Sequence, residues 1–171
     1  MSGTRWVIMG VSGCGKSTIG QALAAHHGVA FVEGDEFHPP ANVAKMSAGL
    51  ALDDHDRAGW LLALQAELRA AAGQGVGLVV SCSSLKRRYR DVLRAGDPTL
   101  RFAHLDGTRD LIAARMRARL EHYMPASLLD SQFRDLEPLQ TDEAGITLAI
   151  TPVPQDLVRL IVASESRSSR V

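Results

Sequence analysis

The sequence predicts an α/β fold, with helices on both faces of a parallel sheet, and two observations lead to this class. Short apolar runs of four or five residues alternate with longer helical patterns, as expected when crossover helices bury strands on both faces. A glycine-rich loop joins the first apolar run to the first helical pattern, which is typical of phosphate-binding α/β proteins. The chain has 171 residues, 46% of them hydrophobic and 22% charged, so it fits one globular domain and excludes a disordered or disulfide-rich class.

Five strands are expected in chain order, each of them mostly apolar. They are Trp6–Met9, Ala30–Glu33, Leu78–Cys82, Arg101–Leu105 and Ile146–Ile150. Helices are expected over Lys16–His26, Asp54–Ala72 and about Arg109–Glu121, because apolar residues recur there every three or four positions. In Asp54–Ala72 this repeat places Trp60 and Leu64 on one face, which we expect to pack on the sheet.

The segment from about residue 122 to 143, here called the lid segment, interrupts the alternation. It carries a helical pattern that begins at Pro125 and lies before the last strand, and its length suits a mobile flap over a site. Residues 164–171 are mostly small or polar and are expected to form a frayed tail. No repeat or linker divides the chain, so residues 1–171 are predicted to form one domain.

Charge and cysteine content narrow the function classes. Nineteen basic residues balance nineteen acidic ones, so no broad basic surface is predicted for nucleic acid or for an anionic membrane. No apolar run approaches the roughly 18 residues of a membrane helix, and the N-terminus lacks a signal-peptide pattern. Cys14 and Cys82 form no CxxC pair, which is typical of a reducing compartment. We therefore expect a cytoplasmic protein with free thiols and with neither nucleic acid nor membrane as a partner.

The strongest functional signal is the pattern GxxxxGK[ST] at residues 10–17, between an expected strand and an expected helix. The residues expected to bind nucleotide are Gly10, Val11, Ser12, Gly13, Cys14, Gly15, Lys16, Ser17 and Thr18. Backbone N–H groups and the helix N-terminus hold phosphates in such loops, the lysine reaches the β- and γ-phosphates, and the serine ligates Mg²⁺. ATP and Mg²⁺ are therefore the expected cofactors, with Ser17 as the metal ligand. Cys14 is expected to supply mainly its backbone N–H, although a thiol near a helix N-terminus can have a lowered pKa.

The next question is which group receives the phosphate. The strand Leu78–Cys82 lacks the acid that nucleotide-driven motors and switches carry there, which weakens that class and leaves the second metal ligand open. Asp35 follows the second strand, at the edge where open α/β sheets bind ligands. Asp35 is thus the candidate general base, or else it caps the following turn.

Three arginines lie where an anionic partner is needed. Arg57 is in the first turn of an otherwise acidic helix start and shares a face with Trp60, so it either binds an acceptor carboxylate or pairs with its own acidic turn. Arg115 and Arg119 lie on the apolar side of their helix. They either meet the transferring phosphoryl group when the lid segment closes or form internal ion pairs.

Several sequence blocks together resemble those of the small P-loop gluconokinases. These blocks are residues 10–17, GD-x-x-HP at 34–39, N-x-x-KM at 42–46, DD-x-x-R-x-x-WL at 53–61, residues 82–90, residues 131–133 and residues 136–137. The resemblance covers nearly the whole chain. It implies a five-stranded parallel sheet in the order 2-3-1-4-5 with a closing helical lid, a homodimer, and transfer of the γ-phosphoryl group of ATP to the 6-hydroxyl of D-gluconate.

The resemblance also implies an acceptor pocket. Its residues would be Asp35, His38, Lys45, Arg57, Lys86 and Arg90. His38 could instead close a turn before Pro39, and Arg90 could be a solvated surface charge. The stretch Thr151–Pro154 is where related kinases hold the adenine base, and His122 matches a family histidine with no role that we can derive.

Two other functions stay open at this point. One is a kinase for another small hydroxy acid, such as shikimate. The other is a regulatory module that binds ATP without transferring phosphate.

Overall fold

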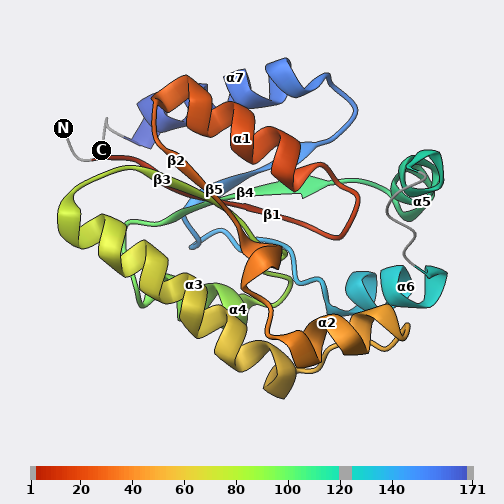
Figure 1. Ribbon diagram of the computed structural model, residues 1–171. Coiled ribbons are helices and arrows are strands. Elements are labelled where there is room, and N and C mark those ends of the chain that lie inside the picture. The colour runs from red at the N-terminus through yellow and green to blue at the C-terminus, as the bar shows by residue number, and fades with distance from the viewer. Residues whose placement is uncertain (1–2, 120–124, 169–171) are drawn as a thin grey trace.

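The computed structural model describes residues 3–119 and 125–168, and within them five parallel strands form one sheet in the order β2-β3-β1-β4-β5 (Figure 1). The strands are β1 (Arg5–Met9), β2 (Ala30–Glu33), β3 (Leu78–Ser81), β4 (Arg101–Asp106) and β5 (Gly145–Ala149). The sequence-based strand bounds differ from these by at most one residue at either end. The expected α/β class and strand order are thus confirmed.

Helices cover both faces of the sheet. They are α1 (Lys16–His27), α2 (Pro40–Ser47), α3 (Asp54–Gln74), α4 (Arg87–Arg94), α5 (Arg109–Ala118), α6 (Ala126–Asp135) and α7 (Pro154–Ser168), and a short 3₁₀ turn, η1 (Gly34–Phe37), follows β2. In Figure 1, α1 and α7 lie on one face, α3 and α4 lie on the other, and α5 and α6 lie beyond the carboxyl end of β4. The start of α1 lies at the same edge of the sheet, because this helix follows the loop at the carboxyl end of β1.

Two apolar layers follow from the alternation of side chains along the central strand. Trp6 and Ile8 belong to the cluster that packs with α1 and α7, whereas Val7 and Met9 belong to the cluster under α3 and α4. Because successive strand residues point to opposite faces, one short apolar strand serves both layers. Trp60 and Leu64 pack in the second cluster, as the helical repeat predicted.

The start of α3 is fixed by its own acidic residues. The Asp53 carboxylate accepts a hydrogen bond from the backbone N–H of Asp56 at 2.7 Å, and the Asp56 carboxylate accepts one from the N–H of Asp53 at 2.9 Å. This is a capping box, which satisfies N–H groups at the helix start that have no helical partner. It also fixes the helix turn that carries Arg57.

Two helices were not expected from the sequence. In α2, Pro40 occupies the first turn, where a missing N–H costs nothing, so the Pro-Pro pair begins a helix and does not only close a turn. In α7 the helix continues to Ser168, which corrects the expectation of a frayed tail from residue 164. Glu165 explains the order there, because its carboxylate contacts Trp6 Nε1 at 2.7 Å and His27 Nε2 at 3.0 Å.

The lid segment contains α6, so its helical pattern is confirmed. The preceding helix, expected to about Glu121, ends at Ala118, and His122 lies outside the described residues. Within 3–119 and 125–168, no helix has the length and apolar content that crossing a bilayer requires.

Candidate active site

The loop between β1 and α1 has the backbone of an anion-binding site. Gly13 and Gly15 both have positive φ, 83° and 99°, a conformation that residues with a Cβ rarely adopt. Gly15 is the residue immediately before α1, so the loop ends at the positive end of the helix dipole. This arrangement suits phosphate groups.

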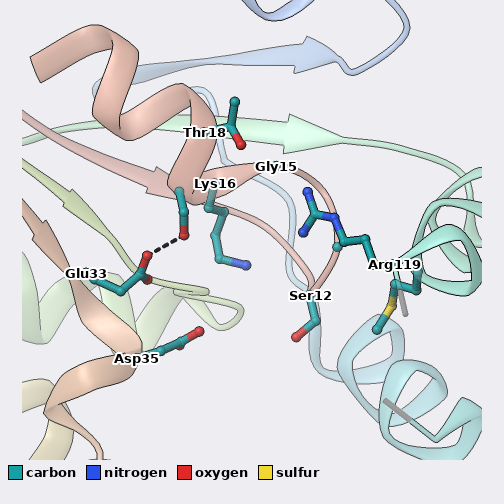
Figure 2. A pocket seen from close by; sticks show the side chains of 10 residues that line it. Ser12, Gly15, Lys16, Thr18, Glu33, Asp35 and Arg119 are labelled. Carbon is teal, nitrogen blue, oxygen red and sulfur yellow. Dashed lines mark hydrogen bonds between the residues drawn. The ribbon is translucent and has the colours of Figure 1, made fainter. Parts of the chain in front are cut away.

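A cavity of about 480 Å³ opens beside this loop (Figure 2). It is lined by Ser12, Gly13, Gly15, Lys16, Ser17, Thr18, Glu33, Asp35, Met116 and Arg119. A second cavity of about 180 Å³ shares Ser12, Lys16 and Asp35 with the first. The structure therefore brings together two adjoining spaces that meet at one serine, one ammonium group and one carboxylate.

Lys16 and Asp35 both point into the larger cavity (Figure 2). The Lys16 ammonium group donates a hydrogen bond to the carbonyl of Val11 at 3.1 Å, within its own loop. Asp35 is exposed, and its carboxylate makes no hydrogen bond within the described residues, although its backbone carbonyl accepts one from the N–H of His38 at 3.3 Å. Its carboxylate is therefore free to accept a proton from a ligand in the cavity.

The position of Asp35 depends on close contact between β2 and β3. A Cβ on Gly34 would lie 2.0 Å from the carbonyl oxygen of Ser81, so only glycine permits this approach. The N–H of Gly34 donates to Ser81 Oγ at 3.1 Å, and the Gly34 carbonyl accepts from Trp60 Nε1 at 2.7 Å. These contacts fix the turn that presents Asp35 to the cavity.

Glu33 is a site residue that was not predicted from the sequence. Its carboxylate accepts hydrogen bonds from Ser17 Oγ and, at 2.5 Å, from Ser81 Oγ, and Figure 2 shows it facing the phosphate loop. A serine hydroxyl and a carboxylate supply the oxygen ligands that Mg²⁺ prefers, so these residues fit a magnesium site. The sequence could have indicated Glu33, because this residue ends the same strand that Asp35 follows.

The second cavity has a cation at its wall. It is lined by Ser12, Lys16, Asp35, His38, Met46, Ala51, Leu52, Arg57, Trp60, Ser83, Leu128, Ser131 and Gln132. Arg57 is buried, and its Nη1 donates to Tyr89 Oη at 2.9 Å and to Asp135 Oδ2 at 3.2 Å. Its Nε and Nη2 make no hydrogen bond within the described residues. Arg57 therefore pairs with Asp135 of α6 and not with the acidic residues of its own helix turn. Its remaining N–H groups can donate to a ligand.

His38 also lines this cavity, and its ring stacks on that of Trp60 with the ring centroids 4.1 Å apart. Burial lowers the pKa of His38, although the nearby charge of Asp35 opposes this, so the imidazole is neutral at pH 7. The Asn42 side-chain amide lies 3.3 Å from His38 Nδ1. A neutral ring of this kind offers a hydrogen bond to a hydroxyl group and no charge.

Lys45 and Lys86, expected in the acceptor pocket, are not among the residues that line either cavity. Lys45 Nζ lies 2.6 Å from Asp56 Oδ2, and Lys86 Nζ lies 3.0 Å from Asp54 Oδ1. Both lysines therefore neutralise the acidic first turn of α3 in this conformation.

Arg90 requires a correction. Its side chain is fully buried, and its Nε and Nη2 bind the Glu143 carboxylate at 2.7 and 2.9 Å. The remaining Nη1 donates to the carbonyls of Ser84 and Glu137 at 2.9 and 3.0 Å. The structure thus supports neither a substrate-binding role for Arg90 nor a solvated surface charge, because a buried guanidinium with all its donors used cannot reach a ligand.

Arg115 of α5 and Arg119, which directly follows that helix, have different positions. Arg119, the residue that follows the helix, is exposed and extends toward the phosphate loop from across the cavity (Figure 2). Arg115 Nη2 donates to the carbonyl of Ile150 at 2.8 Å and is not among the cavity-lining residues. Only Arg119 is therefore placed to meet a phosphoryl group without rearrangement. Thr151–Pro154, expected near the adenine, directly follow Ile150 and line neither cavity.

Both cysteines are buried and free. Burial raises the pKa of the Cys14 thiol, and it raises that of Cys82 to about 11. For Cys14, burial disfavours the charged thiolate by more than Lys16 and the backbone N–H groups at the helix N-terminus stabilise it. Cys14 stays a neutral thiol, as a role limited to its backbone requires.

Comparison with known proteins finds relatives that match most of the chain. The family model described as Shikimate kinase matches residues 12–143. The chain is 46% identical to the thermosensitive gluconokinase of Escherichia coli (strain K12), over 85% of this chain and 78% of that protein. It is 48% identical to a gluconokinase of Gluconobacter oxydans, over 84% and 80% of the two chains. A crystal structure of a gluconokinase from Sinorhizobium meliloti 1021 is similar with a TM-score of 0.88 and 41% identity, covering 97% of this chain and 93% of that one.

Proposed function

The chain belongs to the gluconokinase family, and on that premise we propose that it transfers the γ-phosphoryl group of ATP to the 6-hydroxyl of D-gluconate, giving 6-phosphogluconate and ADP. The observation that carries the proposal is the junction of two cavities at Lys16 and Asp35. One cavity borders the phosphate loop, and the other contains a buried arginine with free donors. A phosphoryl donor and a small acid can therefore meet at that junction.

In the proposed reaction, the loop N–H groups and Lys16 hold the phosphates and stabilise the charge on the transferring group. Asp35 lies where it can orient the acceptor hydroxyl and accept its proton. Arg119 adds positive charge from the opposite side of the larger cavity. Positioning and charge stabilisation account for most of phosphoryl-transfer catalysis, and these three side chains supply both.

The acceptor end is proposed to be read by Arg57 and His38. The free Nε and Nη2 of Arg57 can bind a carboxylate through two parallel hydrogen bonds. The neutral His38 ring, held by Trp60, offers a hydrogen bond to a hydroxyl of the sugar acid. A polyhydroxy acid carries both groups, with its carboxylate and its terminal hydroxyl at opposite ends. Lys45, Lys86 and Arg115 take part in the proposed reaction after a rearrangement. Closure of the lid segment would release Lys45 from Asp56 and Lys86 from Asp54. The Arg115 side chain would leave the carbonyl of Ile150.

Mg²⁺ belongs to the proposal, with Ser17 and Glu33 as the residues that would hold it, and when bound it would neutralise charge on the nucleotide phosphates. Ser81 keeps Glu33 in place through its hydrogen bond of 2.5 Å. We also propose that the protein acts in the cytoplasm as a homodimer, as its family resemblance implies. Light scattering coupled to gel filtration tests the dimer.

The test is acceptor-dependent release of ADP in the presence of Mg-ATP. The acceptors are gluconate, other aldonates and shikimate, with a reaction lacking acceptor as the baseline. We expect turnover with gluconate well above the baseline, with Lys16→Ala and Asp35→Asn each losing at least about a hundredfold.

The rival functions give different results in the same assay. Turnover with shikimate or another hydroxy acid but not with gluconate would point to a different acceptor. Binding of ATP without turnover on any acceptor would point to a regulatory module and would contradict the proposal.

A further inference from the structure

Helix α6 contacts both halves of the candidate active site. Gln132 and Asp135 are three residues apart on this helix and so lie on the same face. Gln132 binds Ser12 of the phosphate loop, and Asp135 binds Arg57 at the wall of the second cavity. One rigid element therefore touches the loop that would hold the phosphoryl donor and the cation that would hold the acceptor.

The contact between Gln132 and Ser12 uses both ends of the glutamine amide. The backbone N–H of Ser12 donates to Gln132 Oε1 at 2.7 Å, and Gln132 Nε2 donates to Ser12 Oγ at 3.2 Å. Two bonds from one amide to one residue fix the orientation of that amide and of the loop at Ser12. Gln132 also lines the second cavity, whereas Ser12 lines both.

We propose that Gln132 is a positioning residue, which sets the phosphate loop relative to the acceptor pocket so that the transferring group and the acceptor hydroxyl are aligned. This inference rests on the proposed function, since it assigns a role within the same reaction. Phosphoryl transfer requires the acceptor hydroxyl to approach the transferring phosphoryl group closely and in line. A displacement of the reacting groups by about 1 Å can lower the rate about a hundredfold. The phosphates themselves are bound by many other groups of the loop, so Gln132 affects alignment more than ATP affinity.

The alternative is that Gln132 only stabilises the packing of α6. Stability and alignment have different kinetic effects. A purely structural role changes the amount of folded enzyme, and so lowers turnover with and without acceptor in proportion. A positioning role lowers acceptor-dependent turnover selectively and leaves both the KM for ATP and the acceptor-independent hydrolysis of ATP nearly unchanged.

The experiment uses Gln132→Met, which keeps the length of the side chain and removes both hydrogen bonds. We expect kcat with gluconate to fall about tenfold, because without both hydrogen bonds the loop can shift relative to the acceptor, with the KM for ATP changed less than about threefold. Gln140→Ala is the control, because Gln140 is exposed and its side chain bonds, among the described residues, only Arg87, at 2.6 Å. This control should retain the kinetics of the unaltered protein.

A second variant covers the case in which Gln132→Met folds poorly. Ser12→Ala removes the 3.2 Å bond but keeps the backbone bond, so we expect kcat to fall about threefold with α6 unaltered. Amide hydrogen exchange of the peptide spanning residues 10–17 gives a readout that needs no acceptor, and exchange at Ser12 should be faster in Gln132→Met than in Gln140→Ala.

These outcomes separate the two proposals. If the unaltered protein turns over no acceptor, the proposed function fails, while the exchange rates still report whether Gln132 holds the loop. If gluconate is phosphorylated but Gln132→Met and Ser12→Ala keep kcat within about twofold, or if all activities fall in proportion, the positioning role is overturned.

Discussion

Replacing Glu143 with glutamine is expected to destabilise this protein severely, although Glu143 lies outside both cavities. Its carboxylate is fully buried and accepts hydrogen bonds from Arg90 Nε at 2.7 Å, Arg90 Nη2 at 2.9 Å and Arg94 Nη2 at 2.8 Å. The backbone N–H of Gln140 adds a fourth bond at 2.9 Å. Glutamine keeps the shape but leaves the Arg90 guanidinium without a compensating charge, whereas Arg94 retains an ion pair with Asp91 at 2.7 Å.

The expected loss of folding free energy is about 3 kcal/mol or more. Breaking a buried ion pair by removing one partner costs about 3–5 kcal/mol. Independently, although burial acts to raise the pKa of Glu143, its hydrogen bonds with Arg90, Gln140 and Arg94 lower that pKa from 4.5 to about 2, which corresponds to about 3 kcal/mol of stability at neutral pH. Since a domain has only about 5–15 kcal/mol in total, the loss is a large share.

The assay is urea unfolding of Glu143→Gln at pH 7, with Asp142→Asn as the control. Asp142 pairs with Arg87 at 2.7 Å, but its side chain is 64% exposed, so its loss should cost at most about 1 kcal/mol. Because the folded-state pKa of Glu143 is depressed, its stabilisation is complete above about pH 4.5 and is lost as the pH falls toward 2. The acid sensitivity of the unaltered protein should therefore be reduced in Glu143→Gln. Equal, small effects of the two substitutions would show that the buried ion pair of Glu143 contributes little to stability.

Three further predictions concern the site. Arg57→Lys should raise the KM for gluconate by about tenfold to a hundredfold with a smaller effect on kcat, because lysine cannot form the two parallel bonds; an unchanged KM in steady-state assays would contradict the assignment. Glu33→Gln should raise the Mg²⁺ concentration needed for half-maximal activity at least about tenfold, and an unchanged Mg²⁺ titration would exclude Glu33 from the metal site. Arg90→Met should lower the melting temperature and leave the KM for gluconate unchanged in the folded fraction, since Arg90 is buried against Glu143; a raised KM at unaltered stability would return Arg90 to the acceptor pocket.

The fold was predictable because its signals are local. Buried parallel strands read as short apolar runs, and the bounds of all five follow within one residue. Helices α2 and α7 were not predicted, because the sequence at each of them is compatible with more than one structure. Pro39-Pro40 is compatible with a turn or a helix start, and the polar end of α7 is ordered by Glu165 contacting Trp6, a residue 159 positions away in the sequence.

Some residues of the candidate site could be placed from the sequence, and others could not. Lys16 and Asp35 follow strands at a predictable edge of the sheet, so the sequence could place them together. Arg90 could not be placed, because its partner Glu143 is 53 residues away and only the folded chain brings the two into contact. Lys45 and Lys86 are similar cases, since their ion pairs with the first turn of α3 depend on how α2 and α4 pack beside it.

Phosphoryl transfer to the 6-hydroxyl of gluconate is tested by identifying the product by ³¹P and ¹³C NMR after reaction of the protein with Mg-ATP and gluconate. We expect one phosphate ester, on the terminal carbon that carries the 6-hydroxyl group, formed in step with ADP and absent with Lys16→Ala. A phosphate ester at another carbon, or ADP with inorganic phosphate alone, would contradict this expectation.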